Sequence, residues 1–98
     1  MKRGYVYIMT NSPSGTLYIG VTSDLSARIH QHRTGTGTGS DFCKRHRLTR
    51  LVHVETFDTM LEAITREKQL KSWQGSWKLN LIGRTNPDWT DLSDHLPL

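Results

Sequence analysis

The chain has 98 residues, which is enough for one domain with a modest hydrophobic core but not for a large one. Its formal charge of +4 favours an anionic partner such as nucleic acid, although an ordinary basic surface explains this charge equally well. Cys43 is the single cysteine, which excludes an internal disulfide and a multi-cysteine zinc site. No stretch approaches the roughly 20 apolar residues of a membrane span and no secretory signal is present, so we expect a cytoplasmic protein.

Two stretches near the N-terminus predict an antiparallel hairpin. Residues 5–9 and 17–21 each alternate between two faces, as half-buried strands do, and the turn-forming residues 11–15 join them. The apolar face should pack on the core. The other face carries Tyr7 and Tyr18, which a loop of this length can bring side by side.

A helix should follow this hairpin. Thr22 or Ser23 is a good N-cap, and Asp24 would then lie in the first turn. Arg28 and His32 are four residues apart, so the helix places them on one face. The sequence therefore sets a guanidinium and an imidazole close to the tyrosines of the hairpin.

The middle of the chain predicts a loop and a third strand. Residues 34–40 are rich in glycine, which favours a flexible loop, and they lack the Lys-Ser/Thr ending of a phosphate-binding P-loop. The basic cluster 44–47 precedes a strand at about residues 50–57, with Val52 and Val54 on its core face. We expect the buried positions of the small antiparallel sheet to be Val6, Ile8, Ile19, Val52 and Val54.

A second long helix should begin at the capping box Thr59–Glu62 and run to about Trp73, with Gly75 ending it. Its inward stripe consists of Met60, Ala63, Ile64 and Leu70. Glu67 lies in the middle of that stripe, and carboxylates are seldom buried unless they are paired or bind a metal. From this pattern alone, a buried ion pair with Arg28 and a metal site remain equally open. Residues 77–82 predict a further short helix, and the segment from residue 86 onward predicts a loop.

Four motifs in the correct order resemble the GIY-YIG endonuclease superfamily. They are Tyr5-Val6-Tyr7 and, after ten residues, Tyr18-Ile19-Gly20, then residues 22–28 with His32, residues 66–71, and residues 86–89. The resemblance covers nearly the whole chain and is closest to small stand-alone bacterial members, which are similar to the N-terminal nuclease domain of the excision-repair nuclease subunit. It implies an α/β (α+β) fold with a three-stranded antiparallel sheet flanked by helices. The single domain would span residues 1–98, with a core to about residue 83 and a C-terminal tail, 84–98.

The resemblance also implies a function. It suggests a metal-dependent endonuclease that hydrolyses DNA phosphodiester bonds in repair or recombination, uses Mg²⁺ or Mn²⁺, and has no contact with membranes. We expect it to act as a monomer. Two alternatives remain: a nucleic-acid-binding module with little or no cleavage activity, and a small interaction protein that merely retains the fold.

The roles of the family's residues carry over to matching positions. Tyr7 and Tyr18 match the two motif tyrosines, Arg28 the helix arginine, and Glu67 the metal-binding glutamate. His32 matches a histidine that many members carry. The late asparagine of the family corresponds to Asn86, with Asn80 as a rival by spacing. The first motif glycine is replaced by Tyr5, and Val21 and Thr22 stand where relatives of the excision-repair type carry a lysine.

Phosphodiester hydrolysis needs an attacking water and stabilisation of charge on the phosphoryl oxygens. Glu67 would hold the cation and Arg28 the phosphate. Tyr7 is favoured as the base, which requires its pKa to fall by roughly 2–3 units from about 10, and Tyr18 would orient the water, although these roles can be reversed. DNA backbone contacts are expected from Arg33, Lys44, Arg45, Arg47, Lys68 and Lys71. The competing interpretation treats the tyrosines as packing residues and leaves His32 at the surface.

Overall fold

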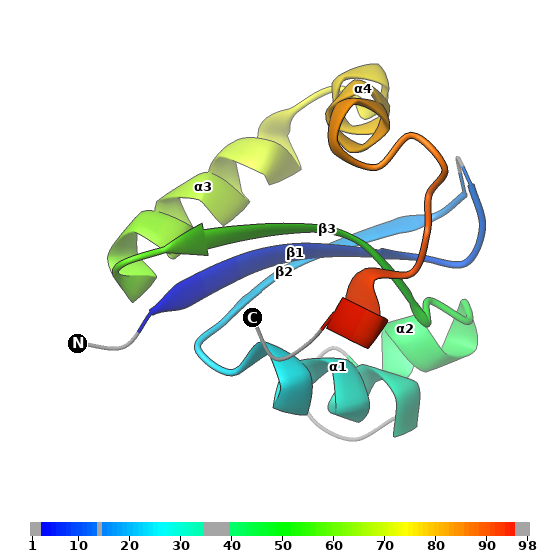
Figure 1. Ribbon diagram of the computed structural model, residues 1–98, viewed down its shortest axis with the longest axis horizontal. Coiled ribbons are helices and arrows are strands. Elements are labelled where there is room, and N and C mark those ends of the chain that lie inside the picture. Colours follow the sequence, from blue (N-terminus) through cyan, green and yellow to red (C-terminus); the bar gives the residue numbers. More distant parts are fainter. Residues whose placement is uncertain (1–2, 14, 35–39, 96–98) are drawn as a thin grey trace.

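A computed structural model describes residues 3–13, 15–34 and 40–95 of the chain (Figure 1). The elements are β1 (Gly4–Thr10), β2 (Leu17–Thr22), α1 (Leu25–Thr34), α2 (Ser40–Arg45), β3 (Arg50–Phe57), α3 (Met60–Ser72), α4 (Gly75–Thr85) and the 3₁₀ helix η1 (Leu92–His95). Most of the predicted glycine-rich loop lies outside the described residues. In the part of the chain that is described, no helix is long and apolar enough to cross a membrane.

The three strands form one antiparallel sheet in the order β2–β1–β3. In the hairpin, Ile8 lies opposite Ile19, and Met9 lies opposite Tyr18. The predicted α+β fold with a three-stranded antiparallel sheet and flanking helices is therefore confirmed.

A bulge interrupts the pairing of β1 with β3. The β3 partners of Ile8 and Met9 are not adjacent, and Val52 lies between them. The extra residue reverses the alternation, so Val52 packs with the cluster around Ile8 whereas Val54 packs against the opposite face. The expectation that Val52 and Val54 share one core face is wrong for this reason.

Helices cover both faces of the sheet: α3 and α4 lie on one side, and α1, α2 and η1 on the other (Figure 1). The first face joins Val6, Ile8, Ile19 and Val52 to Ala63, Leu70, Leu81, Ile82 and Trp89. The second joins Tyr7 and Met9 to Leu25, Ile29, Cys43, Leu48 and Leu51. The prediction of a half-buried first strand is therefore wrong, because a second helical layer covers the face that carries Tyr7.

The helix ends agree with the sequence in part. The Asp24 carboxylate accepts a hydrogen bond from the Ala27 amide, at 3.2 Å, so Asp24 rather than Thr22 or Ser23 caps α1. The helix α2 was not predicted. The Thr59 hydroxyl caps α3 by accepting from the Glu62 amide, as predicted.

The connection from α3 to α4 differs from the prediction. The helix α3 ends at Ser72, close to the expected residue, but Gly75 is the first residue of α4 and not merely a stop. The short helix expected at residues 77–82 is longer in both directions. The segment that follows α4 is also part of the fold, because Trp89 is 8% exposed and packs in the first core cluster. The expected boundary near residue 83 therefore does not separate the core from a free tail.

Candidate active site

Tyr7 lies on the central strand and points to the α1 side of the sheet. Directly opposite it on β2 is Gly20, and a Cβ atom at that position would overlap the Tyr7 hydroxyl. A glycine is required here because the tyrosine side chain passes over the neighbouring backbone. This contact gives a physical reason for the glycine in Tyr18-Ile19-Gly20.

His32 lies beneath this tyrosine. Leu25, Ile29 and His32 form the buried stripe of α1, and the His32 Nε2 atom is 2.7 Å from the Tyr7 hydroxyl. The interpretation of His32 as a surface residue is therefore wrong. Burial, helped by the nearby Arg28 charge, lowers the pKa of His32 to about 4, so the imidazole is neutral at pH 7. Its Nδ1 atom is buried and has no hydrogen-bond partner within the described ranges.

Tyr18 completes a cluster of three rings. Its centroid lies 6.3 Å from that of Tyr7 and 4.9 Å from that of His32, which it meets edge-on. The predicted adjacency of the two tyrosines is thus confirmed. Tyr7 and His32 are fully buried, whereas Tyr18 is half-buried and lines a cavity of about 300 Å³ together with Lys71 and Lys78. Tyr18 is therefore the member of this cluster that borders an open cavity.

Burial sets the protonation state of Tyr7. Desolvation raises its pKa above the usual value, and a hydrogen bond from Arg28 lowers it by less than burial raises it. Arg28 also donates to the Gln31 side chain, at 3.0 Å. The fall in pKa that a base at Tyr7 would require is opposed here, because the tyrosine is removed from water.

Glu67 lies on α3, which covers the other face of the sheet. Its side chain is 14% exposed, in agreement with its place in the inward stripe. Its ion-pair partner is Lys71, at 3.1 Å and one turn along the same helix, in place of the Arg28 partner considered from the sequence. Since Lys71 also lines the cavity at Tyr18, this pair lies beside the β2 edge of the site.

The structure does not bring Asn86 to these groups. Its side-chain amide donates to the carbonyls of Val52 and Thr90, at 3.1 and 2.8 Å, and its oxygen accepts from the Thr90 amide. Val52 belongs to β3, on the far side of β1 from Tyr18. Asn86 thus fixes the loop after α4 to the bulge, which is a structural role. Its rival Asn80 is exposed and lines a different hollow.

The basic residues divide into two groups. Arg33 donates to the Thr49 carbonyl, the Asp91 carboxylate and the Ser93 hydroxyl, all within 3.1 Å. Arg33 therefore links α1 to β3 and the C-terminal segment, and its expected contact with DNA stays a prediction. The other predicted DNA contacts are exposed: Lys44, Arg45, Arg47, Lys68 and Lys71.

A partly buried charge network that was not predicted from the sequence joins β3 to α3. His53 and Arg66 both contact the Glu55 carboxylate at 2.8 Å. Burial alone would raise the pKa of Glu55, but these hydrogen bonds outweigh it and bring the pKa to about 2. The spacing of His53 and Glu55 along β3 was the available signal, because residues two apart on a strand share a face.

The comparisons with known proteins agree with this geometry. Residues 3–80 match the GIY-YIG catalytic domain. The chain belongs to the GIY-YIG family. It is 36% identical over 88 residues to a UPF0213 protein of Syntrophus aciditrophicus, a match that spans 90% of this chain and 98% of the relative. It is 38% identical over 82 residues to a UPF0213 protein of Staphylococcus saprophyticus, with 84% and 96% covered. No solved structure gives a significant match.

The donor atoms of this GIY-YIG domain set what it can bind. In the described ranges, no group of three or more His, Cys, Asp or Glu residues is arranged to hold a metal. The nearly buried Glu67 offers one carboxylate, and a single carboxylate completed by waters and a substrate phosphate suits Mg²⁺. Lys71 is 55% exposed and therefore free to move off the carboxylate when a cation arrives. The residues present fit a weakly held divalent cation.

Proposed function

We propose that this GIY-YIG domain is an endonuclease that hydrolyses phosphodiester bonds of DNA with the help of Mg²⁺ or Mn²⁺. The observation that carries the proposal is the cluster of Tyr7, Tyr18 and His32 beside Arg28, with Tyr18 open to a cavity lined by lysines. Family membership supports a nuclease-type reaction. Repair or recombination of DNA is the context that such an activity would serve.

The burial of the two tyrosines assigns them different roles. A fully buried Tyr7 cannot contact an attacking water, and its raised pKa opposes a role as base. Tyr18 lines the open cavity and is the tyrosine that can orient the water. Tyr7 and His32 then act as positioning residues that hold the Tyr18 ring. Tyr18 thus keeps the role favoured from the sequence, whereas Tyr7 changes from base to positioning residue.

The positively charged groups of the site would bind the phosphate. Arg28 is half-buried close to Tyr7, and a guanidinium can bind a phosphate through two parallel hydrogen bonds. Glu67 would hold the divalent cation, which when bound neutralises charge on the phosphoryl oxygens. Lys71 and Lys78 line the cavity at Tyr18 and supply further positive charge for the DNA backbone.

A cleavage assay on plasmid, flap and branched DNA, with and without Mg²⁺ or Mn²⁺, tests the proposal. Tyr18→Phe removes only the hydroxyl and should lower the cleavage rate by about 100-fold or more. The matched control is Tyr5→Phe, because Tyr5 is a half-buried tyrosine of β1 outside the ring cluster, and it should cleave normally. Full activity of Tyr18→Phe would contradict the assignment.

One observation favours a binding module with little cleavage activity as the second candidate. Lys71 neutralises the Glu67 carboxylate at 3.1 Å in the present arrangement. In that case the wild type binds DNA in the same assays, and neither Mg²⁺ nor Mn²⁺ produces cleavage of any substrate.

A further inference from the structure

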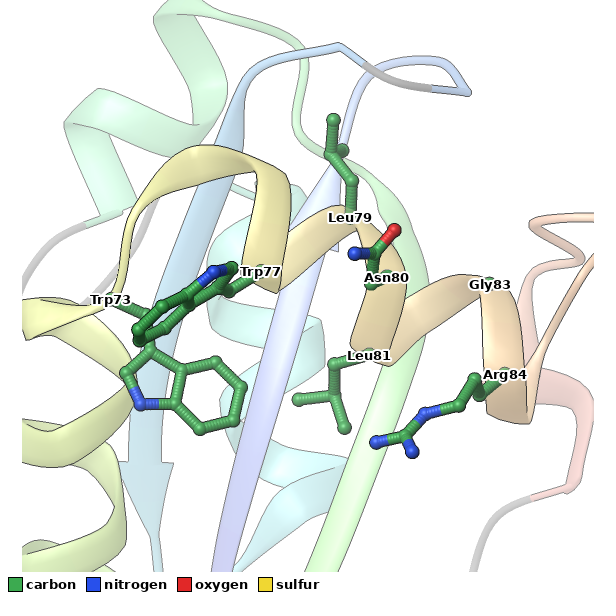
Figure 2. Close-up of a pocket in the computed structure, with 7 residues that line it drawn as sticks. All are labelled: Trp73, Trp77, Leu79, Asn80, Leu81, Gly83 and Arg84. Atoms are coloured by element: carbon green, nitrogen blue, oxygen red, sulfur yellow. The ribbon is translucent and has the colours of Figure 1, made fainter.

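A second and larger hollow lies on α4, away from the ring cluster. Its volume is about 580 Å³, and it is lined by Trp73, Trp77, Leu79, Asn80, Leu81, Gly83 and Arg84 (Figure 2). The roles proposed above for the cleavage reaction involve none of these residues. The hollow therefore needs an explanation of its own.

One wall of the hollow is fixed in advance by the charge network on β3. The guanidinium carbon of Arg66 lies 5.0 Å from the centroid of the Trp73 ring. Arg66 is itself held by two hydrogen bonds to the Glu55 carboxylate, at 2.8 and 3.2 Å. Trp73 is thus a pre-organised aromatic wall, stacked on a cation that cannot easily move.

The second wall is the Trp77 ring, which stands nearly perpendicular to Trp73 at an angle of 83°, with 6.0 Å between the centroids. Trp77 is 52% exposed, a large apolar surface to leave in water. Trp77, Leu81 and Arg84 recur at helical spacing along one side of α4. Figure 2 shows the side chains of Leu81 and Arg84 projecting to the same side of α4 as the Trp73 ring. Gly83 adds open space, because a Cβ atom there would meet nothing within 4 Å.

The charge around the hollow suits an anionic chain. None of the residues that line this hollow or the cavity at Tyr18 is acidic. Arg84 provides a cation inside the hollow, and Lys78, the neighbour of Trp77, lines the cavity on the other side. A surface that combines aromatic faces with cations is the kind that stacks nucleobases and holds phosphates.

We propose that this hollow binds one unpaired nucleobase of a DNA strand whose backbone passes Lys71 and Lys78 on the way to Tyr18. The base stacks against the exposed Trp77 ring, and Arg84 contacts an adjoining phosphate. The inference rests on the proposed function only in taking this strand to be the substrate. The site itself is a binding site and needs no cleavage.

Binding in EDTA, measured by fluorescence anisotropy, tests the site apart from catalysis. The probes are a blunt duplex, the same duplex with a short single-stranded extension, and the same extension built of abasic sugar-phosphate units. Wild type should bind the base-bearing extension about 5- to 100-fold more tightly than the abasic one. Trp77→Ala should remove this difference and leave binding of the blunt duplex unchanged.

Two further variants guard against a folding artefact. Leu61→Ala removes an apolar side chain that is 74% exposed on α3, outside the hollow, and should bind like wild type. Gly83→Leu places a larger side chain in the hollow and leaves both tryptophans in the sequence. It should reduce binding as Trp77→Ala does, whereas Gly83→Ala should not. Free mononucleotides form a separate arm, and tight binding of these would assign the site to a nucleotide ligand.

Several outcomes overturn the inference. Equal affinity of wild type for base-bearing and abasic extensions excludes a nucleobase site. Unchanged binding by Trp77→Ala and Gly83→Leu does the same, and would leave the hollow as a surface for a protein partner. If the wild type cleaves DNA but these variants bind normally, the inference fails while the proposed function stands. If the variants behave as expected and no cleavage occurs with any metal, the proposed function fails while the inference stands.

Discussion

The hydroxyl of Tyr7 lies 2.7 Å from the Nε2 atom of His32, and both side chains are fully buried between the sheet and α1. Because Nδ1 of the same imidazole has no partner in the described part of the chain, this contact offsets much of the cost of burying the ring. The pair joins the first motif tyrosine to the helix that carries Arg28.

Tyr7→Phe should lower the free energy of unfolding by about 1–3 kcal/mol, because it leaves Nε2 buried without its partner. Urea unfolding measures this loss. In a His32→Leu background the same change should cost much less, since the group that loses its partner is gone. Equal losses in the two backgrounds would mean that the hydrogen bond contributes nothing.

The stability should depend on pH through His32. The pKa of His32 is about 4 in the folded protein and 6.5 in the unfolded chain, so the unfolded chain binds more protons between pH 4 and 6.5. The contribution of the neutral His32 to the free energy of unfolding is present in full above about pH 6.5. It should fall by about 2–4 kcal/mol as the pH drops to 4. Glu55, with a folded pKa of about 2 against 4.5, adds its own loss only below about pH 4.5. Between pH 6.5 and 4.5 the stability of His32→Leu should therefore be nearly flat in urea titrations.

Gly20→Ala should destabilise the fold by about 1–3 kcal/mol, because the new methyl group overlaps the Tyr7 hydroxyl and forces the ring to shift. Thermal melts measure the loss. Tyr7→Phe should cost less in this background than in wild type, but it should not relieve the overlap fully, since the ring atoms Cζ and Cε1 would still lie against the added Cβ. A melting temperature equal to that of wild type would show that the contact is easily relieved.

Glu67→Gln should change the free energy of unfolding by less than about 1 kcal/mol, because its partner Lys71 is exposed and surface pairs contribute little. The same variant should lose the metal-dependent cleavage proposed for the domain. Lys71→Gln breaks the same ion pair but keeps the carboxylate, so it should retain a response to Mg²⁺. A Glu67→Gln protein that melts far lower yet cleaves DNA would assign Glu67 a purely structural role.

The exposed basic cluster around the end of α2 should bind the DNA backbone. Replacing Lys44, Arg45 and Arg47 together with glutamine should weaken binding and reduce the salt dependence by roughly one slope unit per lost phosphate contact. Binding titrations over a range of salt concentrations measure the slope. Arg3→Gln, at the exposed start of the chain, is the control for loss of charge alone. An unchanged slope in the triple variant would make the cluster an ordinary solvated surface.

The sequence by itself determined the three strands, the three longer helices and the candidate residues. Alternation located the strands, the Thr59–Glu62 pair located the start of α3, and the resemblance to the GIY-YIG superfamily singled out Tyr7, Tyr18 and Arg28 as one set. The first two signals are local, because periodicity reports the phase of side chains within one element. They placed the two tyrosines on one face of the hairpin, where the structure has them.

Only the tertiary structure decided what covers each face and which groups pair across elements. Periodicity within a strand does not report a second helical layer, so the burial of Tyr7 and His32, and with it the direction of both pKa shifts, stayed hidden. One inserted residue at Val52 reverses which face the side chains of β3 point to, and no residue type in the strand signals this bulge. The sequence predicted Arg33 only as a contact for DNA, whereas the fold brings the carboxylate of Asp91, 58 residues away, to 2.9 Å from its guanidinium. Desolvation and long-range pairing depend on distances between segments, which the order of residues does not specify locally.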